Sequence, residues 1–199
     1  MRRHLLFFII LTFISVLVLA LFAMSVWPKA AAKKPIDTTS PYSLAPLTAP
    51  TVQYGDPTLG PANAKITIVE FADYACGPCA NIATTLQKIL ANYPTSVRLI
   101  WKDFPDSDKN KEALTAANAA RCAADQNAFW LYHDALFANQ ASLSTTTYNQ
   151  LATNLSLDTD AFSKCLDQTT DQPIIEKNIE EGIRLRIDGT PYLFINDRR

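Results

Sequence analysis

The chain has 199 residues, of which 48% are hydrophobic and 19% charged, and its formal net charge is −1. This length suits one ordinary domain with an appendage, and the composition excludes collagen, a fully disordered chain and a many-helix membrane protein. From residue 35 onward, 13 basic and 19 acidic residues give a balance of −6. A net acidic body without a Lys/Arg cluster predicts that the chain does not bind nucleic acid. Its five glycines are too few for a Gly-rich phosphate loop.

An uncharged run of 23 residues, Leu5–Trp27, follows Arg2 and Arg3 near the amino terminus. As a helix it would extend about 34 Å, enough to cross a bilayer core of about 30 Å. A cleavable signal peptide has an apolar core of only about 7–15 residues, so the length favours an uncleaved transmembrane anchor. Cleavage near Ala30–Ala32 stays open as the alternative. We expect residues 1–4 to be cytoplasmic and the domain that follows the anchor to lie outside the cytoplasm.

Residues 28–53 carry five prolines with Ser, Thr and Ala between them, which predicts an extended linker. The globular domain is expected over residues 54–199. Apolar runs predict strands at 66–72, 97–101 and 192–195, with a helix between the first two that ends before Pro94. A helical insertion is expected over about 106–187, with segments near 111–126, 128–139, 146–154, 158–167 and 174–186. This order predicts an α/β fold.

The motif Cys76-Gly77-Pro78-Cys79 stands between the first predicted strand and its helix. At a helix amino terminus, unpaired N–H groups and the helix dipole stabilise a thiolate, so Cys76 is expected to have a lowered pKa and to be the attacking thiol. Pro78 suits a first helical turn. Cys79, one turn further on, is expected to be the less accessible, resolving thiol. Two alternatives are that the motif supplies two ligands of a zinc site or forms a structural disulfide. Zinc needs about four ligands, and the sequence offers no second pair of ligands at a suitable spacing.

Glu70 lies six positions before Cys76, inside an apolar strand. A buried carboxyl group has a raised pKa and could exchange the proton that Cys79 must lose or gain. The alternative is an exposed strand glutamate with a lysine partner. His133 is expected to be a satisfied or surface helix histidine rather than a catalyst.

Four segments in order resemble the DsbA-like thiol–disulfide oxidoreductases of the thioredoxin superfamily: Val69–Cys79, Arg121–Ala123, Phe129–Phe137 and Gly189–Tyr192. The likeness covers about residues 54–196. It implies a thioredoxin fold with a helical insertion, with Cys76 as attacking thiol and Cys79 as its partner. It also implies that Pro191 is cis beside the disulfide, and that Thr190 offers backbone contacts to an extended substrate. No cofactor or metal is expected.

The chain departs from this family in two respects. Gly77-Pro78 is the thioredoxin dipeptide, whereas DsbA has Pro-His, and thioredoxin-type sites have potentials of about −270 mV against about −120 mV for DsbA. The direction of electron flow is therefore left open. The family also continues past Asn196 with a strand and a terminal helix, whereas this chain stops at Arg199. We therefore expect either that the sequence is a fragment or that the sheet lacks an edge strand and a covering helix.

Cys122 and Cys165 fall on two predicted insertion helices. They are either buried free thiols or, in an oxidising compartment, a structural disulfide, which the family resemblance supports. Such a bond would close a 44-residue loop and stabilise the fold by about 4 kcal/mol in the chain-entropy model.

The sequence thus predicts a bacterial thiol–disulfide oxidoreductase held by a single-pass anchor in the cytoplasmic membrane, with its catalytic domain extracytoplasmic. Its expected partners are cysteine-containing proteins and a membrane redox partner. Two alternatives remain: a disulfide reductase or isomerase on the same scaffold, and a non-enzymatic module that binds Cu(I) through its two thiols.

Overall fold

The computed structural model describes residues 46–199. The predicted anchor at 5–27, the four residues before it and most of the predicted linker lie outside these residues. Within the described part, no helix is long and apolar enough to cross a bilayer. These described residues belong to one compact unit.

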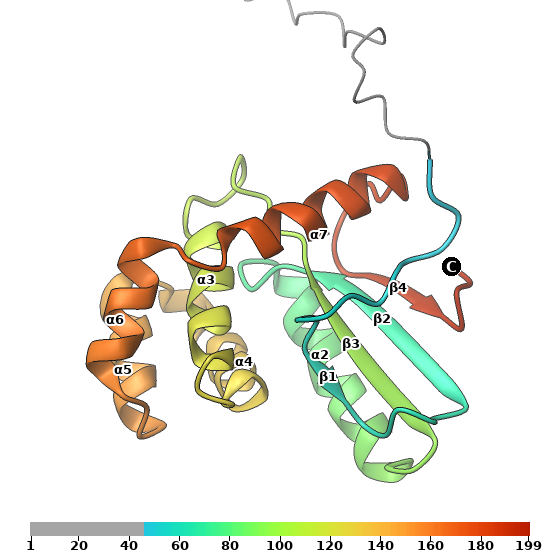
Figure 1. Ribbon diagram of the computed structural model, residues 1–199, viewed down its shortest axis with the longest axis horizontal. Helices are drawn as coiled ribbons and strands as arrows, with labels where there is room; N and C mark the ends of the chain where they lie inside the picture. The colour runs from blue at the N-terminus through green and yellow to red at the C-terminus, as the bar shows by residue number, and fades with distance from the viewer. Residues whose placement is uncertain (1–45) are drawn as a thin grey trace, which may run out of the picture. The chain divides into compact units, whose positions relative to one another are not determined.

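A four-stranded mixed sheet is the centre of the fold (Figure 1). Its strands β1 (Thr58–Leu59), β2 (Ile66–Ala72), β3 (Val97–Asp103) and β4 (Tyr192–Ile195) are arranged in the order β1-β3-β2-β4. Strands β2 and β3 are parallel, while β1 and β4 are antiparallel to their neighbours. The apolar runs predict the last three strands. The two-residue β1 carries no such pattern and was not predicted.

Both faces of the sheet are covered, which explains why β2 is apolar at successive positions. On one face Ile68 and Leu99 pack with Leu86 of α2 (Gly77–Asn92). On the other face Phe71 packs with Phe194 and Leu185, directly after α7 (Gln172–Arg184). The β2–α2–β3 unit therefore places the start of α2 at the carboxyl end of β2.

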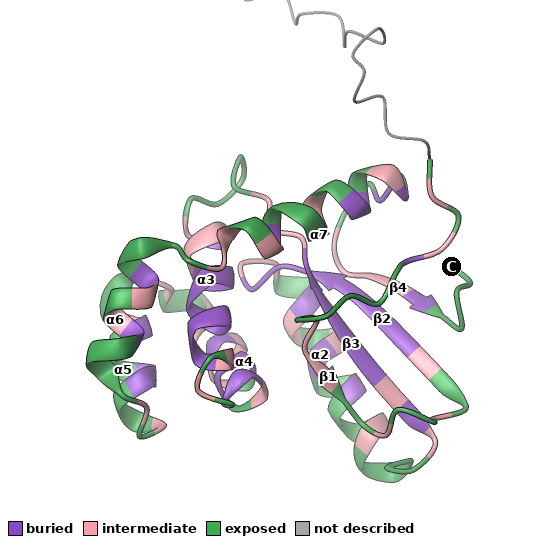
Figure 2. Ribbon diagram, viewed as in Figure 1, coloured by how far each residue is buried: buried purple, intermediate pink, exposed green. Residues whose placement is uncertain are grey.

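The predicted insertion is a group of helices between β3 and α7, drawn beside the sheet in Figure 1. It comprises α3 (Glu112–Ala124), α4 (Phe129–Ala138), a 3₁₀ turn (Gln140–Ser142), α5 (Thr145–Asn154) and α6 (Thr159–Gln168). These helices share a core that includes Tyr132, Tyr148 and Phe162, and Figure 2 shows α3 largely buried. Asp158 caps α6 by accepting hydrogen bonds from two backbone N–H groups, as its position predicts. The described domain is thus a thioredoxin-like α/β fold with a helical insertion.

Residues 47–53, within the predicted linker, lie along α7. The Leu47 N–H donates to the carbonyl of Arg184, and both the N–H and the hydroxyl of Thr51 donate to the Glu181 carboxylate. This segment is therefore held to the domain before β1 begins.

A buried ion cluster joins three segments on the α7 side of the sheet. The Lys102 ammonium of β3 lies 2.7 Å from the Asp56 carboxylate and 2.8 Å from that of Glu181, and all three side chains are almost completely buried. The cluster ties the chain before β1 to β3 and α7. Because each charge has a partner, the burial of all three is tolerated.

Candidate active site

The two cysteines of the motif lie where β2 passes into α2. Cys76 is the residue immediately before the helix, with an extended backbone, and Cys79 is in its first turn. The two form a disulfide, with their Cα atoms 5.3 Å apart. Cys79 is fully buried, Cys76 is half-buried, and Gly77 and Pro78 are exposed. A partner approaching from solvent therefore meets Cys76 first.

The helix start supplies the electrostatics of the site. The first N–H groups of a helix have no intrahelical partners, and with the helix dipole they favour negative charge at this end. Pro78 occupies the first turn, where a missing N–H costs nothing. A thiolate on Cys76 would lie at this end of the 16-residue helix α2. The arrangement suits a sulfur that leaves and attacks as an anion.

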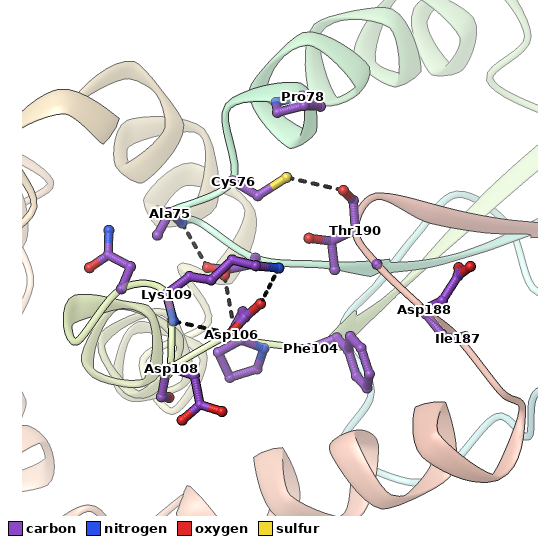
Figure 3. Close-up of a pocket in the computed structure, with 15 residues that line it drawn as sticks. Ala75, Cys76, Pro78, Phe104, Asp106, Asp108, Lys109, Ile187, Asp188 and Thr190 are labelled. Atoms are coloured by element: carbon purple, nitrogen blue, oxygen red, sulfur yellow. Dashed lines mark hydrogen bonds and ion pairs between the residues drawn. The ribbon is translucent and has the colours of Figure 1, made fainter. Parts of the chain in front are cut away.

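The Thr190-Pro191 segment lies beside the disulfide, and its peptide bond is cis. The Thr190 carbonyl oxygen is 3.4 Å from the Cys76 sulfur. A dashed line joins these two atoms in Figure 3. The structure therefore brings Cys76 and Cys79 together with Thr190 and Pro191, which lie more than a hundred positions further along the sequence.

The loop that carries Cys76 is held by two side chains that the sequence analysis did not single out. The Asp73 carboxylate accepts hydrogen bonds from the N–H groups of Ala75 (2.7 Å) and Asp106 (3.0 Å). Burial raises the pKa of Asp73. The Gln140 amide donates to the carbonyls of Tyr74 (2.6 Å) and Cys76 (2.9 Å). No local pattern marks Gln140, because its partners lie 64 and 66 positions away.

A pocket of about 570 Å³ opens beside Cys76 (Figure 3). Its walls come from residues 73–78, 104–110 and 187–190. The Lys109 ammonium pairs with Asp106 at 2.6 Å and lowers the pKa of that carboxyl group. Asp108 and Asp188 add exposed acidic groups. The pocket can receive a segment of another chain next to the reactive sulfur.

Glu70 is fully buried, and neither carboxyl oxygen has a hydrogen-bond partner among residues 46–199. Burial raises its pKa from 4.5 to about 8. Glu70 shares a small cavity with Ala83 of α2, one helical turn after Cys79 on the buried face of that helix. The carboxyl group therefore lies beneath α2, and its raised pKa favours the neutral form near pH 7.

The nearest strand lysine does not neutralise Glu70. Glu70 is opposite Trp101 in the β2–β3 register, and Phe71 is opposite Lys102. Because side chains alternate along a strand, Lys102 projects from the α7 face of the sheet while Glu70 projects from the α2 face. The structure thus agrees with the expected buried carboxyl group and not with the alternative, an exposed glutamate with a lysine partner.

Cys122 of α3 and Cys165 of α6 form a second disulfide, with an S–S distance of 2.00 Å and Cα atoms 5.7 Å apart. The bond joins two helices of the insertion. With the Cys76–Cys79 pair, it leaves no free cysteine in the described part of the chain.

A disulfide at the head of a helix, on a βαβ unit beside a cis-proline segment, defines a thioredoxin-type redox site. The family described as Thioredoxin matches residues 53–199, about three quarters of the sequence. The chain belongs to this family.

Among known proteins, the chain is 36% identical over 144 residues to the Na(+)/H(+) antiporter NhaA 3 of Salinispora tropica, covering 72% of this chain and 22% of the antiporter. The chain thus spans about a fifth of the length of that relative. The crystal structure of oxidised BdbD from Bacillus subtilis matches with a TM-score of 0.69 at 24% identity, over 77% of this chain and 88% of BdbD. Pseudomonas aeruginosa DsbA2 matches with a TM-score of 0.60 at 25% identity, over 74% and 83% of the two chains. The described domain is a DsbA-like thiol–disulfide oxidoreductase.

Proposed function

We propose that the protein exchanges disulfides with cysteine-containing proteins outside the cytoplasm of a bacterium. In this proposal Leu5–Trp27 anchors it in the cytoplasmic membrane and a membrane redox partner resets it. The observation that carries the chemistry is the Cys76–Cys79 disulfide at the amino terminus of α2, with the Cys76 sulfur 3.4 Å from the Thr190 carbonyl. The uncharged run before residue 28 and the second disulfide support the location.

In the oxidising direction, a substrate thiolate attacks the Cys76 sulfur. A substrate–Cys76 bond forms and the Cys76–Cys79 bond breaks, so Cys79 leaves as a thiolate and takes a proton from Glu70. A second substrate thiolate then attacks the substrate sulfur of this mixed disulfide. Cys76 leaves as a thiolate, which the helix terminus stabilises. The substrate loses two electrons and the protein becomes a dithiol.

The reset transfers these two electrons to the membrane redox partner, and the Cys76–Cys79 disulfide forms again. All steps are reversible, so the reduction potential decides whether the domain works as an oxidase or a reductase. A value near −120 mV would identify an oxidase, and a value near −270 mV a reductase.

The activity is tested with the full chain in membranes and a reduced peptide that carries two cysteines. We expect disulfide formation in the peptide with wild-type protein and none with Cys76→Ser. Equal rates for wild type and Cys76→Ser would refute the proposal. A reporter fused after Ala49 that is active only outside the cytoplasm tests the orientation, and an inactive reporter would place the domain on the other side.

A further inference from the structure

The pocket beside Cys76 carries an excess of negative charge. Four aspartates and one lysine are among the residues that line it. The lysine, Lys109, pairs with Asp106. Asp108 and Asp188 form no ion pair with any residue in the part of the chain that the structure describes. Two carboxylates at the pocket are therefore available to a cation from another chain.

These two carboxylates come from different walls of the pocket. Asp108 belongs to the loop 104–110, and Asp188 lies two positions before Thr190. Both residues are exposed, and Figure 3 shows them on separate segments that border the pocket below Cys76. A chain that pairs with the Thr190 backbone must pass close to Asp188. An acidic rim thus lies beside the path of the substrate.

The same pocket has apolar walls. Phe104, Pro105 and Ile187 line it together with Pro78 of the cysteine motif. Lysine and arginine side chains lay their methylene groups along apolar surface while the charged head stays at a polar edge. A pocket with apolar walls and an acidic rim offers a place to both parts of such a side chain.

Lys109 shows that the pocket accepts an ammonium group. Its Nζ lies 2.6 Å from the Asp106 carboxylate, and its side chain is 82% exposed. An ion pair between exposed side chains contributes little to stability, so a second cation can share or replace it at low cost. The pocket therefore already holds one cation that belongs to the chain itself.

We propose that this pocket selects substrates that carry a lysine or arginine within two positions of the reacting cysteine. The inference rests on the proposed function, because it names the class of protein thiol that the Cys76 site prefers. In an extended chain, residues two positions apart project to the same side, about 7 Å apart. A basic side chain at that spacing faces the pocket when the cysteine faces Cys76. Asp108 and Asp188 are then specificity-determining residues.

The covalent step remains that of the proposed function. The substrate thiolate bonds to the Cys76 sulfur, the Cys76–Cys79 bond breaks, and Cys79 leaves with the electron pair. A nearby cation also lowers the pKa of the substrate thiol and so increases its thiolate fraction. That effect operates on any disulfide, and the test must separate it from recognition by the pocket.

The test uses the full chain in membranes, with its disulfide oxidised, and reduced peptides with one cysteine. The peptides differ only at the second position after the cysteine, which is lysine, norleucine or glutamate. Norleucine has the apolar stem of lysine without the ammonium group. The rate of reduction of the Cys76–Cys79 disulfide is measured by acid quench and mass spectrometry. Each rate is divided by that of the same peptide with oxidised glutathione, which removes the intrinsic reactivity of the thiol.

We expect the corrected rate of the lysine peptide to exceed that of the norleucine peptide by about fivefold at low ionic strength. The glutamate peptide should be the slowest, because like charges repel. High salt should reduce the preference, since it screens exposed charges.

Variants of the pocket should change the lysine-to-norleucine ratio in opposite directions. Asp108→Asn and Asp188→Asn should each lower the ratio, and the double variant should bring it close to one. Lys109→Met frees the Asp106 carboxylate and should raise the ratio. Asp167→Asn removes an exposed carboxylate of α6 and is the matched control, with the wild-type ratio.

Three results would overturn the inference: equal corrected rates for the lysine and norleucine peptides, a wild-type ratio in the Asp108/Asp188 double variant, or an equal fall of the ratio in Asp167→Asn. The last result would assign the preference to net charge and not to the pocket. A failure of the proposed function is distinguishable, because the wild-type disulfide would then react with none of the peptides.

Discussion

The sulfur of Cys76 lies 3.4 Å from the carbonyl oxygen of Thr190, although the two residues are 114 positions apart. The sheet accounts for this proximity. Strand β4 runs antiparallel to β2 with Tyr192 opposite Phe71, so the residues before β4 meet the residues that follow β2. A peptide that pairs with Thr190 would therefore present its cysteine to Cys76 and not to buried Cys79.

This geometry predicts the order in which the reduced cysteines react. Iodoacetamide at mildly acidic pH should modify Cys76 first, because Cys76 is only half-buried at the helix terminus and Cys79 is fully buried. Mass spectrometry of the labelled peptides measures the order. Cys79→Ser should accumulate mixed disulfides with substrates, since no thiol remains to resolve them. Labelling of Cys79 before Cys76 would reverse the assignment of their roles.

Glu70 predicts a specific dependence of stability on pH. Its pKa is about 8 in the folded protein and 4.5 ordinarily, so between these pH values the folded state holds a proton that the unfolded state has released. The stability that Glu70 contributes through this difference in pKa is present in full below about pH 4.5, and it is lost as pH rises through about 8.

Glu70→Gln isolates this effect, because glutamine does not titrate. The variant should gain stability relative to wild type, on the order of 4 kcal/mol, between pH 4.5 and pH 8. Urea unfolding of the oxidised proteins at several pH values measures the difference. A difference that stays constant with pH would show that Glu70 is ionised in the folded protein.

The Cys122–Cys165 disulfide is predicted to stabilise the fold without taking part in exchange. Replacing both cysteines by alanine should lower the free energy of unfolding by about 4 kcal/mol in the chain-entropy model, because the bond closes a long loop. The rate of exchange at Cys76 should remain within about twofold. Loss of exchange in a variant that is still folded would assign this bond a redox role.

Lys102→Met is expected to destabilise the protein by about 3 kcal/mol or more. The change leaves the buried carboxylates of Asp56 and Glu181 without their cation, which costs more than the pairing itself contributes. Lys109→Met, at an ammonium that is 82% exposed, is the control and should change stability by less than about 1 kcal/mol. Similar losses in both variants would argue against a structural role for the buried cluster.

The sequence predicts those features of this domain that are local. The apolar runs of β2 and β3 and the cysteine motif identify a βαβ unit with a redox site, because burial and helix capping leave short-range patterns. Gln140 and Glu181 could not be predicted in the same way. Each contacts residues more than sixty positions away, and such contacts depend on tertiary packing.

His133 shows where a local pattern misleads. Its helix α4 is apolar on several sides, so periodicity does not indicate which face is buried, and the expectation left open a satisfied or a surface histidine. The structure buries the ring among Trp101, Trp130 and Phe137. The packing of α4 against Trp101 of β3 helps to decide the environment of the imidazole, and the sequence of the helix alone does not reveal that packing.

The register of β3 against β2 keeps the Lys102 ammonium away from the Glu70 carboxyl group. Lys102 and Glu70 are separated by one step of the strand pair and face opposite sides of the sheet. Deleting one residue of β3 ahead of Lys102 would move the ammonium to the position of Trp101, next to the carboxyl group. Glu70 would then be ionised at neutral pH and would no longer supply a proton. The odd or even position of a lysine along one strand thus decides whether the acid under the cysteines is neutral or charged.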